Sequence, residues 1–195
     1  PSWGAGRRHF VALSLDPLPD DAMGELLTGL VPGLPAEARA AILARAEGVP
    51  LYAVETVRKL LLDGRIEEHG GSYQPVGDLT DLEVPPTLHA LIAARLDALE
   101  PGLRSLLQDA SVLGQTFTVA SLAAISGQSE ADLERPLRDL VRREVLALNR
   151  DPRSPERGQY GFVQALIREV AYNTLARTDR KAKHLAAARW FESQG

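Results

Sequence analysis

Apolar residues recur every three or four positions along most of this chain of 195 residues, and this spacing constrains its fold more than any other feature. Side chains with this spacing lie on one face of an α-helix, whereas a half-buried strand needs apolar and polar residues to alternate. The pattern begins at Met23, Leu26, Leu27 and Leu30, and it resumes at Leu88. With 45% hydrophobic residues, the chain can bury a sizeable core. The sequence therefore predicts a mainly α fold.

Prolines and glycines divide the first half of the chain into three predicted helices. The pair Asp20-Asp21 stands where a helix cap belongs, Pro35 opens a second helix, and Pro50 opens a third that ends at Gly64. Proline suits a first helical turn because its φ is already helical and the N–H that it lacks has no partner there. Residues 65–74 contain the turn sequence His-Gly-Gly and predict a small hairpin. We expect a three-helix bundle with a hairpin.

The second half of the chain, after a polar linker near residues 78–83, predicts a winged helix. Helices with apolar stripes come first. Two apolar stretches, 145–148 and 159–162, then flank a turn-rich segment with two prolines, which predicts a two-stranded wing. Two further helices are expected over about 163–176 and 180–193.

Four parts are therefore expected along the chain. Residues 1–18 hold a short strand and a connection, because an apolar run in this segment stops at Asp16-Pro17. Residues 19–83 form the helical bundle with its hairpin, 84–162 the winged helix, and 163–195 the C-terminal helices.

Composition excludes several classes of protein. The chain has no cysteine, so neither a disulfide framework nor a thiolate metal site is possible. No apolar run approaches the roughly 18 residues that a membrane-spanning helix needs. We therefore expect a cytoplasmic protein with no membrane partner. The first residue is Pro1 rather than Met, which suggests a piece of a longer protein.

Charge argues against a nucleic-acid partner. The formal charge of -4 is uneven, because residues 1–100 carry 8 basic and 15 acidic side chains, whereas residues 101–195 carry 14 basic and 11 acidic ones. Nucleic-acid-binding proteins usually present a concentrated basic face that neutralises phosphates. The third helix of the expected winged helix, residues 130–144, has four arginines against five acids. Such a helix would gain little from phosphate.

Catalytic motifs are absent from the sequence. Gly24 and Gly29 have the spacing of a phosphate loop, but Leu30-Val31 follows where Lys and Ser or Thr are needed. The four histidines have no zinc-binding spacing, and the Gly-x-Ser-x-Gly motif of hydrolases does not occur. We predict no catalytic residue, no metal ligand and no enzyme activity in this chain.

Two short motifs point to a family. They are Gly48-Val49-Pro50-Leu51-Tyr52 with Glu55, and the run from Tyr160-Gly161-Phe162 through Gln164 to Tyr172. With Arg95-Leu96-Asp97-Ala98-Leu99 between them, and Arg180 and His184 after them, they resemble the helical lid and winged-helix domain of STAND-class signalling ATPases. These AAA+-related modules occur in adenylate cyclase-associated proteins and in large transcriptional regulators. Their nucleotide-binding core, with its Walker A and B motifs, has no counterpart in this sequence, and the resemblance makes residues 1–18 its remnant strand and linker.

The resemblance implies a role for the Gly-x-Pro step. In the family, the proline at the start of this lid helix lies against adenine and the glycine allows a close approach. Gly48 and Pro50 are therefore expected to contact ATP or ADP in the full-length protein, and not in the fragment alone. The two residues can also be explained without a ligand, because glycine commonly ends a helix and proline commonly begins one.

Gln164 departs from the family's motif. Its position corresponds to a histidine that follows the wing and senses the phosphates of bound ADP. An amide donates a hydrogen bond but carries no charge, so the resemblance implies a weakened phosphate contact. Gln164 completes, with Gly48 and Pro50, the set of expected nucleotide-binding residues.

As a whole, the resemblance predicts a regulatory fragment. It would couple the ATP or ADP state of an N-terminal nucleotide-binding core to a fused effector domain or a protein partner. One alternative is a protein-interaction scaffold that needs no nucleotide. Another is a winged-helix DNA-binding module, which fold analogy suggests and the charge of residues 130–144 opposes.

Overall fold

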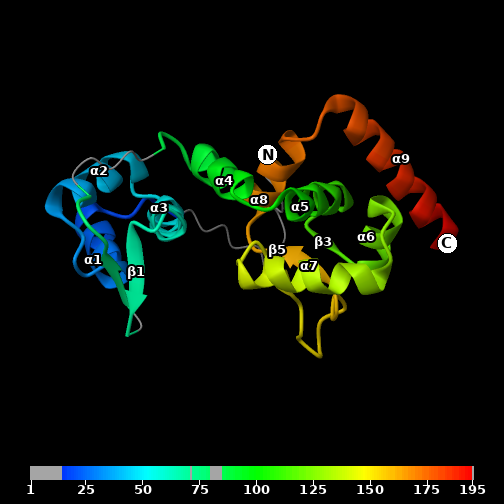
Figure 1. The fold of residues 1–195 in the computed structure, drawn as a ribbon, viewed down its shortest axis with the longest axis horizontal. Helices are drawn as coiled ribbons and strands as arrows, with labels where there is room; N and C mark the ends of the chain where they lie inside the picture. Colours follow the sequence, from blue (N-terminus) through cyan, green and yellow to red (C-terminus); the bar gives the residue numbers. More distant parts are fainter. Residues whose placement is uncertain (1–14, 71, 80–84, 195) are drawn as a thin grey trace, which may run out of the picture. The chain divides into compact units, whose positions relative to one another are not determined.

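Helices dominate the computed structural model, which describes residues 15–70, 72–79 and 85–194 (Figure 1). Within these ranges it contains nine helices and two small antiparallel sheets, so the predicted mainly α fold class is confirmed. The chain divides into two compact units, Pro1–Pro86 and Thr87–Gly195. The expected four-part division is finer than these units and stays a prediction. The strand expected before Asp16 lies outside the described residues, apart from Leu15, which has no regular structure.

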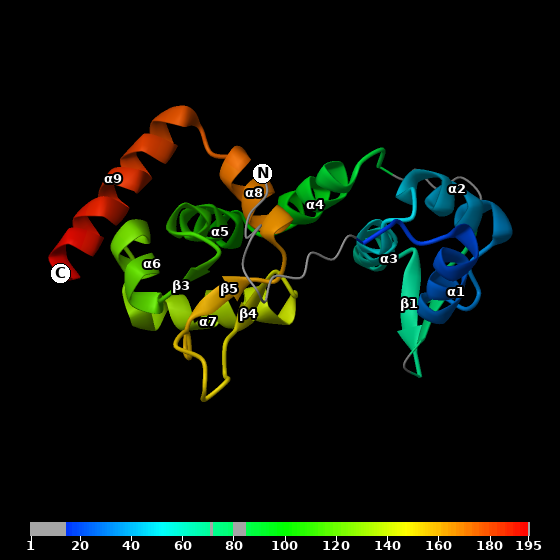
Figure 2. The same cartoon turned by 180° about the vertical axis from the view of Figure 1, so that it is seen from behind.

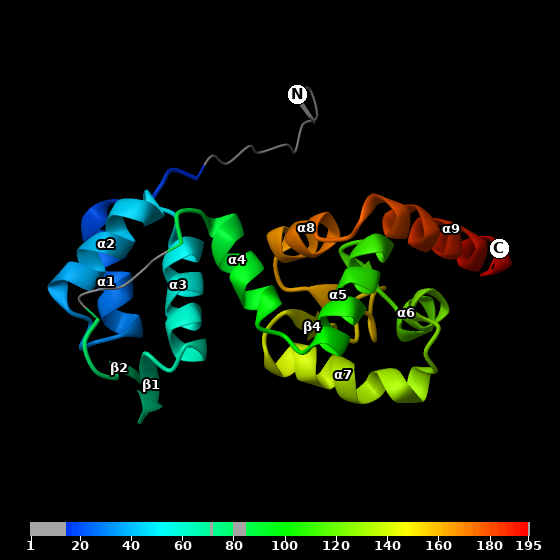
Figure 3. The same cartoon turned by 45° about the horizontal axis from the view of Figure 1, so that its top comes forward.

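The described residues of the first unit form three helices and a hairpin, as the prolines and glycines predict (Figure 3). The elements are α1 (Asp20–Leu30), α2 (Ala36–Ala46), α3 (Pro50–Leu62), β1 (Ile66–His69) and β2 (Ser72–Pro75). The two strands are antiparallel, with Ile66 opposite Pro75. The largest fully buried side chains of this unit are Met23, Leu27, Ile42, Ile66 and Leu79. Each of the three helices contacts the other two.

The start of α1 differs from the prediction. Pro19, not an aspartate, occupies the cap position, and no side chain caps this end. Asp20 and Asp21 lie in the first turn instead, where a negative charge is favoured by the positive end of the helix dipole. The acidic pair therefore stabilises α1 by its charge and not as its cap.

Six helices and a three-stranded sheet form the second unit (Figure 2). The helices are α4 (Leu88–Asp97), α5 (Pro101–Leu113), α6 (Val119–Ser126), α7 (Glu130–Arg142), α8 (Ala165–Asn173) and α9 (Arg177–Gln194), and the strands are β3 (Thr116–Phe117), β4 (Leu146–Leu148) and β5 (Tyr160–Phe162). Strands β4 and β5 form the predicted two-stranded wing, and β3 pairs with the other edge of β5. The sequence did not reveal β3, because a strand of two residues is too short to show alternation.

One apolar cluster joins the elements of the second unit. Its fully buried members include Ile92, Leu107, Leu122, Leu133, Leu137, Leu140 and Ile167. The strands add Phe117 and Phe162, whose ring centroids are 6.2 Å apart. Because Ile167 of α8 lies in this core, the core holds the start of α8 next to the end of the wing.

Helix α9 is attached largely by polar contacts. It lies beside α5 and α6 (Figure 2). Only Ala187 of its described residues is buried. The ammonium group of Lys183 forms an ion pair with the carboxylate of Asp109 on α5, and Asp109 is only 4% exposed. The hydroxyl oxygen of Tyr172, on α8, lies 2.9 Å from Nε2 of His184. None of the described helices, α9 included, is long and apolar enough to cross a membrane.

Asp109 should make the stability of this unit depend on pH. Burial raises the pKa of its carboxyl group above the ordinary value, and Lys183 lowers it only in part. Because the pKa is higher in the folded state than in the unfolded state, the folded chain binds the proton more tightly. The free energy of unfolding is then highest below the unfolded pKa of about 3.9, and it falls as pH rises through the raised pKa.

Asp109→Asn removes this titration, so we expect a flatter pH profile of the free energy of unfolding. The measurement is urea unfolding at steps from about pH 4 to about pH 7. Asp97→Asn, at an aspartate whose side chain is 66% exposed, is the control. An Asp109→Asn profile parallel to that of the unmodified chain would contradict the assignment.

Candidate functional site

The Gly48-Val49-Pro50 step forms the turn between α2 and α3. Glu47 and Gly48 both adopt left-handed backbone conformations, with φ of 46° and 74°. The amide of Val49 closes the turn by donating a hydrogen bond to the carbonyl oxygen of Ala46 at 2.7 Å. Glycine adopts positive φ without a steric penalty, which suits it to the end of α2. Pro50 is the first residue of α3, at the position that the sequence predicts.

A neighbouring segment of the chain covers Gly48. The amide of Leu18 donates a hydrogen bond to the carbonyl oxygen of Gly48 at 2.8 Å. A Cβ atom at position 48 would lie 2.5 Å from the carbonyl oxygen of Leu18 and 2.6 Å from Cβ of Pro17. No side chain fits in that space. The close approach that Gly48 allows is therefore made, in this structure, by the protein's own backbone.

Pro50 is exposed, in contrast to Gly48. Val49 beside it is 42% exposed, so a small apolar surface lies at the start of α3. Pro50 has no N–H, and the amide of Tyr52 donates to the carbonyl oxygen of Val49 at 3.0 Å. The ring of Pro50 is therefore part of the exposed surface of the first unit.

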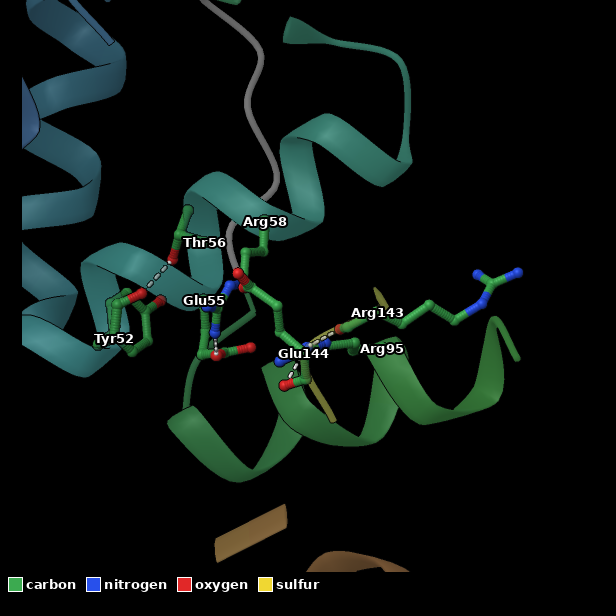
Figure 4. Close-up of polar contacts among 7 residues, drawn as sticks. All are labelled: Tyr52, Glu55, Thr56, Arg58, Arg95, Arg143 and Glu144. Atoms are coloured by element: carbon green, nitrogen blue, oxygen red, sulfur yellow. Dashed lines mark hydrogen bonds and ion pairs between the residues drawn. The ribbon is translucent and has the colours of Figure 1, made fainter. Parts of the chain in front are cut away.

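Polar side chains fix α3 along the turns that follow Pro50 (Figure 4). The hydroxyl of Tyr52, a residue only 2% exposed, donates a hydrogen bond to the carbonyl oxygen of Pro85. The hydroxyl of Thr56 donates to the carbonyl oxygen of Tyr52 at 2.8 Å. Glu55 is also buried, and its carboxylate lies 2.6 Å from Nη1 of Arg58. The Tyr and Glu of the first motif therefore have structural partners within the first unit.

Gln164 precedes α8 in the second unit. It has an extended conformation at the cap position, and its carbonyl oxygen accepts a hydrogen bond from the amide of Ile167 at 3.2 Å. Its side chain is half-buried and does not cap the helix. Gln164 thus lies between β5 and the first turn of α8. The structure brings Gly48 and Pro50 together in one turn, whereas Gln164 belongs to the other unit.

Sequence reasoning assigned no role to Arg95, which binds the backbone just after α7 (Figure 4). Its guanidinium donates to the carbonyl oxygens of Arg143 and Glu144, at 2.5 and 3.0 Å, where α7 ends. Arg95 is only 7% exposed. A signal was present in the sequence, because Arg95 follows Leu91 by four residues and therefore lies on the apolar face of α4.

Other ligand sites have little support within the described ranges. No cluster of three His, Asp or Glu side chains that could hold a metal ion occurs among these residues. A pocket of about 140 Å³ lies near the end of α9, with Phe117, Trp190 and Phe191 among its lining residues. Small-molecule sites usually enclose about 300 Å³ or more, so this pocket is too small for a nucleotide.

No family model, curated protein or solved structure matches this chain. The family resemblance therefore rests on the short sequence motifs alone.

Loss of the Arg95 side chain should destabilise the second unit. Arg95→Ala leaves carbonyl groups at the end of α7 without their buried donor, and we expect a loss of about 2–4 kcal/mol in the free energy of unfolding. Arg95→Lys should lose less, because one ammonium group replaces part of the guanidinium's donors. Denaturant unfolding measures both changes.

Arg104→Ala is the matched control for this prediction. Arg104 pairs with the exposed Asp97 at 2.8 Å, and such surface pairs contribute about 0–1 kcal/mol. Equal losses for Arg95→Ala and Arg104→Ala would show that Arg95 does not hold the end of α7.

Proposed function

We propose that this chain is the lid and winged-helix portion of a STAND-class signalling ATPase. It would couple the ATP or ADP state of a nucleotide-binding core, which this sequence does not contain, to an effector domain or a protein partner. The observation that carries the proposal is the exposed ring of Pro50 at the first turn of α3, directly after the left-handed turn at Gly48.

The surface at the start of α3 suits a planar apolar group. Pro50 and Val49 are both exposed, whereas the residues that follow them in α3 are largely buried. An adenine ring could lie against this surface without breaking a hydrogen bond, because Pro50 has no N–H to satisfy. A bound nucleotide would then contact α3 directly through Pro50, its first residue.

The start of α8 would provide the second contact. Backbone N–H groups at a helix N-terminus favour an anion, and the amide of Gln164 can add a donor to a phosphate oxygen. Gln164 lacks the charge of the histidine that the family places there. We expect phosphate binding at this position to be weaker than in relatives with histidine.

A shift of α8 could displace the wing, because a short segment connects the two. Strand β5 ends at Phe162, two residues before Gln164, and β5 pairs with β4. Strand β4 in turn follows the end of α7, which Arg95 of α4 holds. A nucleotide that binds one arrangement of core, lid and winged helix more tightly than another would shift the population between them. The effector whose activity would change with this population shift is proposed to be a cyclase or a transcriptional regulator.

A protein-interaction scaffold that works without nucleotide is the alternative. Two observations favour it, the uncharged amide of Gln164 and the cover that Pro17 and Leu18 form over Gly48. A DNA-binding module has less support. On α7, Arg138 and Arg142 form ion pairs with acids of the same helix, which leaves little net charge for phosphate. Duplex binding that weakens steeply with salt would favour this module instead.

Pro50→Ala should weaken nucleotide binding in a longer protein that contains the upstream core. We expect about a tenfold loss of affinity for ADP and ATP, or about 1.4 kcal/mol, because a methyl group replaces the ring. Calorimetric titration measures the affinity, and the fragment alone should bind neither nucleotide.

Pro101→Ala is the matched control, because Pro101 is also an exposed proline at the first position of a helix, α5. Both variants lose the rigidity of a proline, and only Pro50→Ala should change nucleotide affinity. If neither protein binds nucleotide although both are folded, the scaffold alternative replaces the proposal.

Gln164→His should strengthen ADP binding in the same longer protein. A protonated imidazole adds a charge beside the phosphates, so the gain should be several-fold and larger at about pH 6 than at about pH 8. Gln164→Asn, which keeps an amide, should show no such pH dependence. A Gln164→His protein with unchanged ADP affinity at both pH values would remove Gln164 from the site.

A further inference from the structure

We infer that residues 15–19 form a detachable strap, which docks on Gly48 and excludes any ligand from that glycine. The strap is the described segment that leads into α1. A ligand in close contact with Gly48 would occupy the space that the strap fills. The part of this inference that concerns nucleotide rests on the proposed function, whereas the strap itself does not.

Burial along the chain shows what covers Gly48. Gly48 is buried, although Glu47, Val49 and Pro50 around it are all exposed. The covering atoms are those of Pro17 and Leu18, because these are the nearest neighbours of a Cβ built at position 48. A ligand can therefore contact Pro50, which is exposed, but not Gly48, which the strap covers.

The strap is held weakly. All five of its residues are exposed, with Leu15 at 94% and Leu18 at 38%. Among the described residues, the amide of Leu18 donates a backbone hydrogen bond to the carbonyl oxygen of Gly48 at 2.8 Å. The carbonyl oxygen of Pro19 accepts one from the amide of Met23 in α1 at 3.0 Å, so only the first of these bonds ties the strap to the covered turn. A segment with little buried apolar surface and few hydrogen bonds opens at low free-energy cost. Release of the strap would uncover Gly48 next to Pro50 and leave a continuous surface at the start of α3.

The glycines of the first unit supply a matched pair of variants. Gly48 and Gly64 have nearly the same positive φ, 74° and 66°, so alanine is strained at both positions. No atom lies within 4 Å of a Cβ built at Gly64, whereas the strap lies at 2.5 Å from one built at Gly48. Only Gly48→Ala should therefore displace the strap.

Hydrogen exchange at the amide of Leu18 tests the strap in the present chain. We expect protection in the unmodified chain and in Gly64→Ala, and a loss of at least about tenfold in Gly48→Ala while amides in the middle of α3 stay protected. Pro17→Gly is a second variant that leaves the α2–α3 turn intact, and it should lower protection of Leu18 several-fold. An unprotected Leu18 in the unmodified chain, or equal protection in Gly48→Ala and Gly64→Ala, would overturn the inference.

ADP added to the longer protein separates this inference from the proposed function. If the nucleotide uses Gly48, saturating ADP should reduce protection of Leu18, and Pro17→Gly should tighten ADP binding several-fold. ADP binding that depends on Pro50 but leaves Leu18 protected would refute the competition and keep the proposed function. Absence of ADP binding would refute the proposed function and leave the strap to be decided by the exchange of the isolated chain.

Discussion

The structure depends on helix ends that turn through the left-handed backbone region. Gly64 makes this turn after α3 and Glu144 after α7, with φ of 66° and 54°, and each turn leads into a hairpin. Glycine adopts this conformation freely, whereas at Glu144 it costs roughly 1–2 kcal/mol. Hydrogen bonds from Arg95 to the carbonyl groups there help to offset that cost. One buried arginine on α4 therefore holds the backbone at the turn that leads into the wing.

The same constraint shapes the candidate site in the first unit. The left-handed turn at Glu47 and Gly48 ends α2 and starts α3 at Pro50, and it also brings a backbone without a side chain to the surface of the bundle. The segment through Pro17 and Leu18 takes that place. Gly48 and Pro50, which the family resemblance treats as one contact, thus have different environments. Under the proposed function, a nucleotide would reach the proline directly, whereas it would reach the glycine only after the strap moved.

Sequence reasoning succeeded where local backbone chemistry decides. Pro50 starts α3 and Gly64 follows its end because proline and glycine restrict or permit φ regardless of distant contacts. It erred at α1, where an aspartate cap was expected and Pro19 holds that position. The role of Arg95 was missed because its partners, Arg143 and Glu144, are almost fifty residues away along the chain. Strand β3 was missed for a similar reason, since its pairing with β5 defines it.

The sequence by itself determined the mainly α class, the helices of both units, the two hairpins and the placement of Pro50 and Gln164 at helix starts. These features follow from apolar spacing and from residues that act on their own backbone. Only the tertiary structure decided that Pro17 and Leu18 cover Gly48, that Arg95 binds the end of α7, and that Lys183 pairs with the buried Asp109. Such contacts join residues far apart in the chain, so packing selects the partners, even where a local pattern, as at Arg95, marks a residue as facing the core.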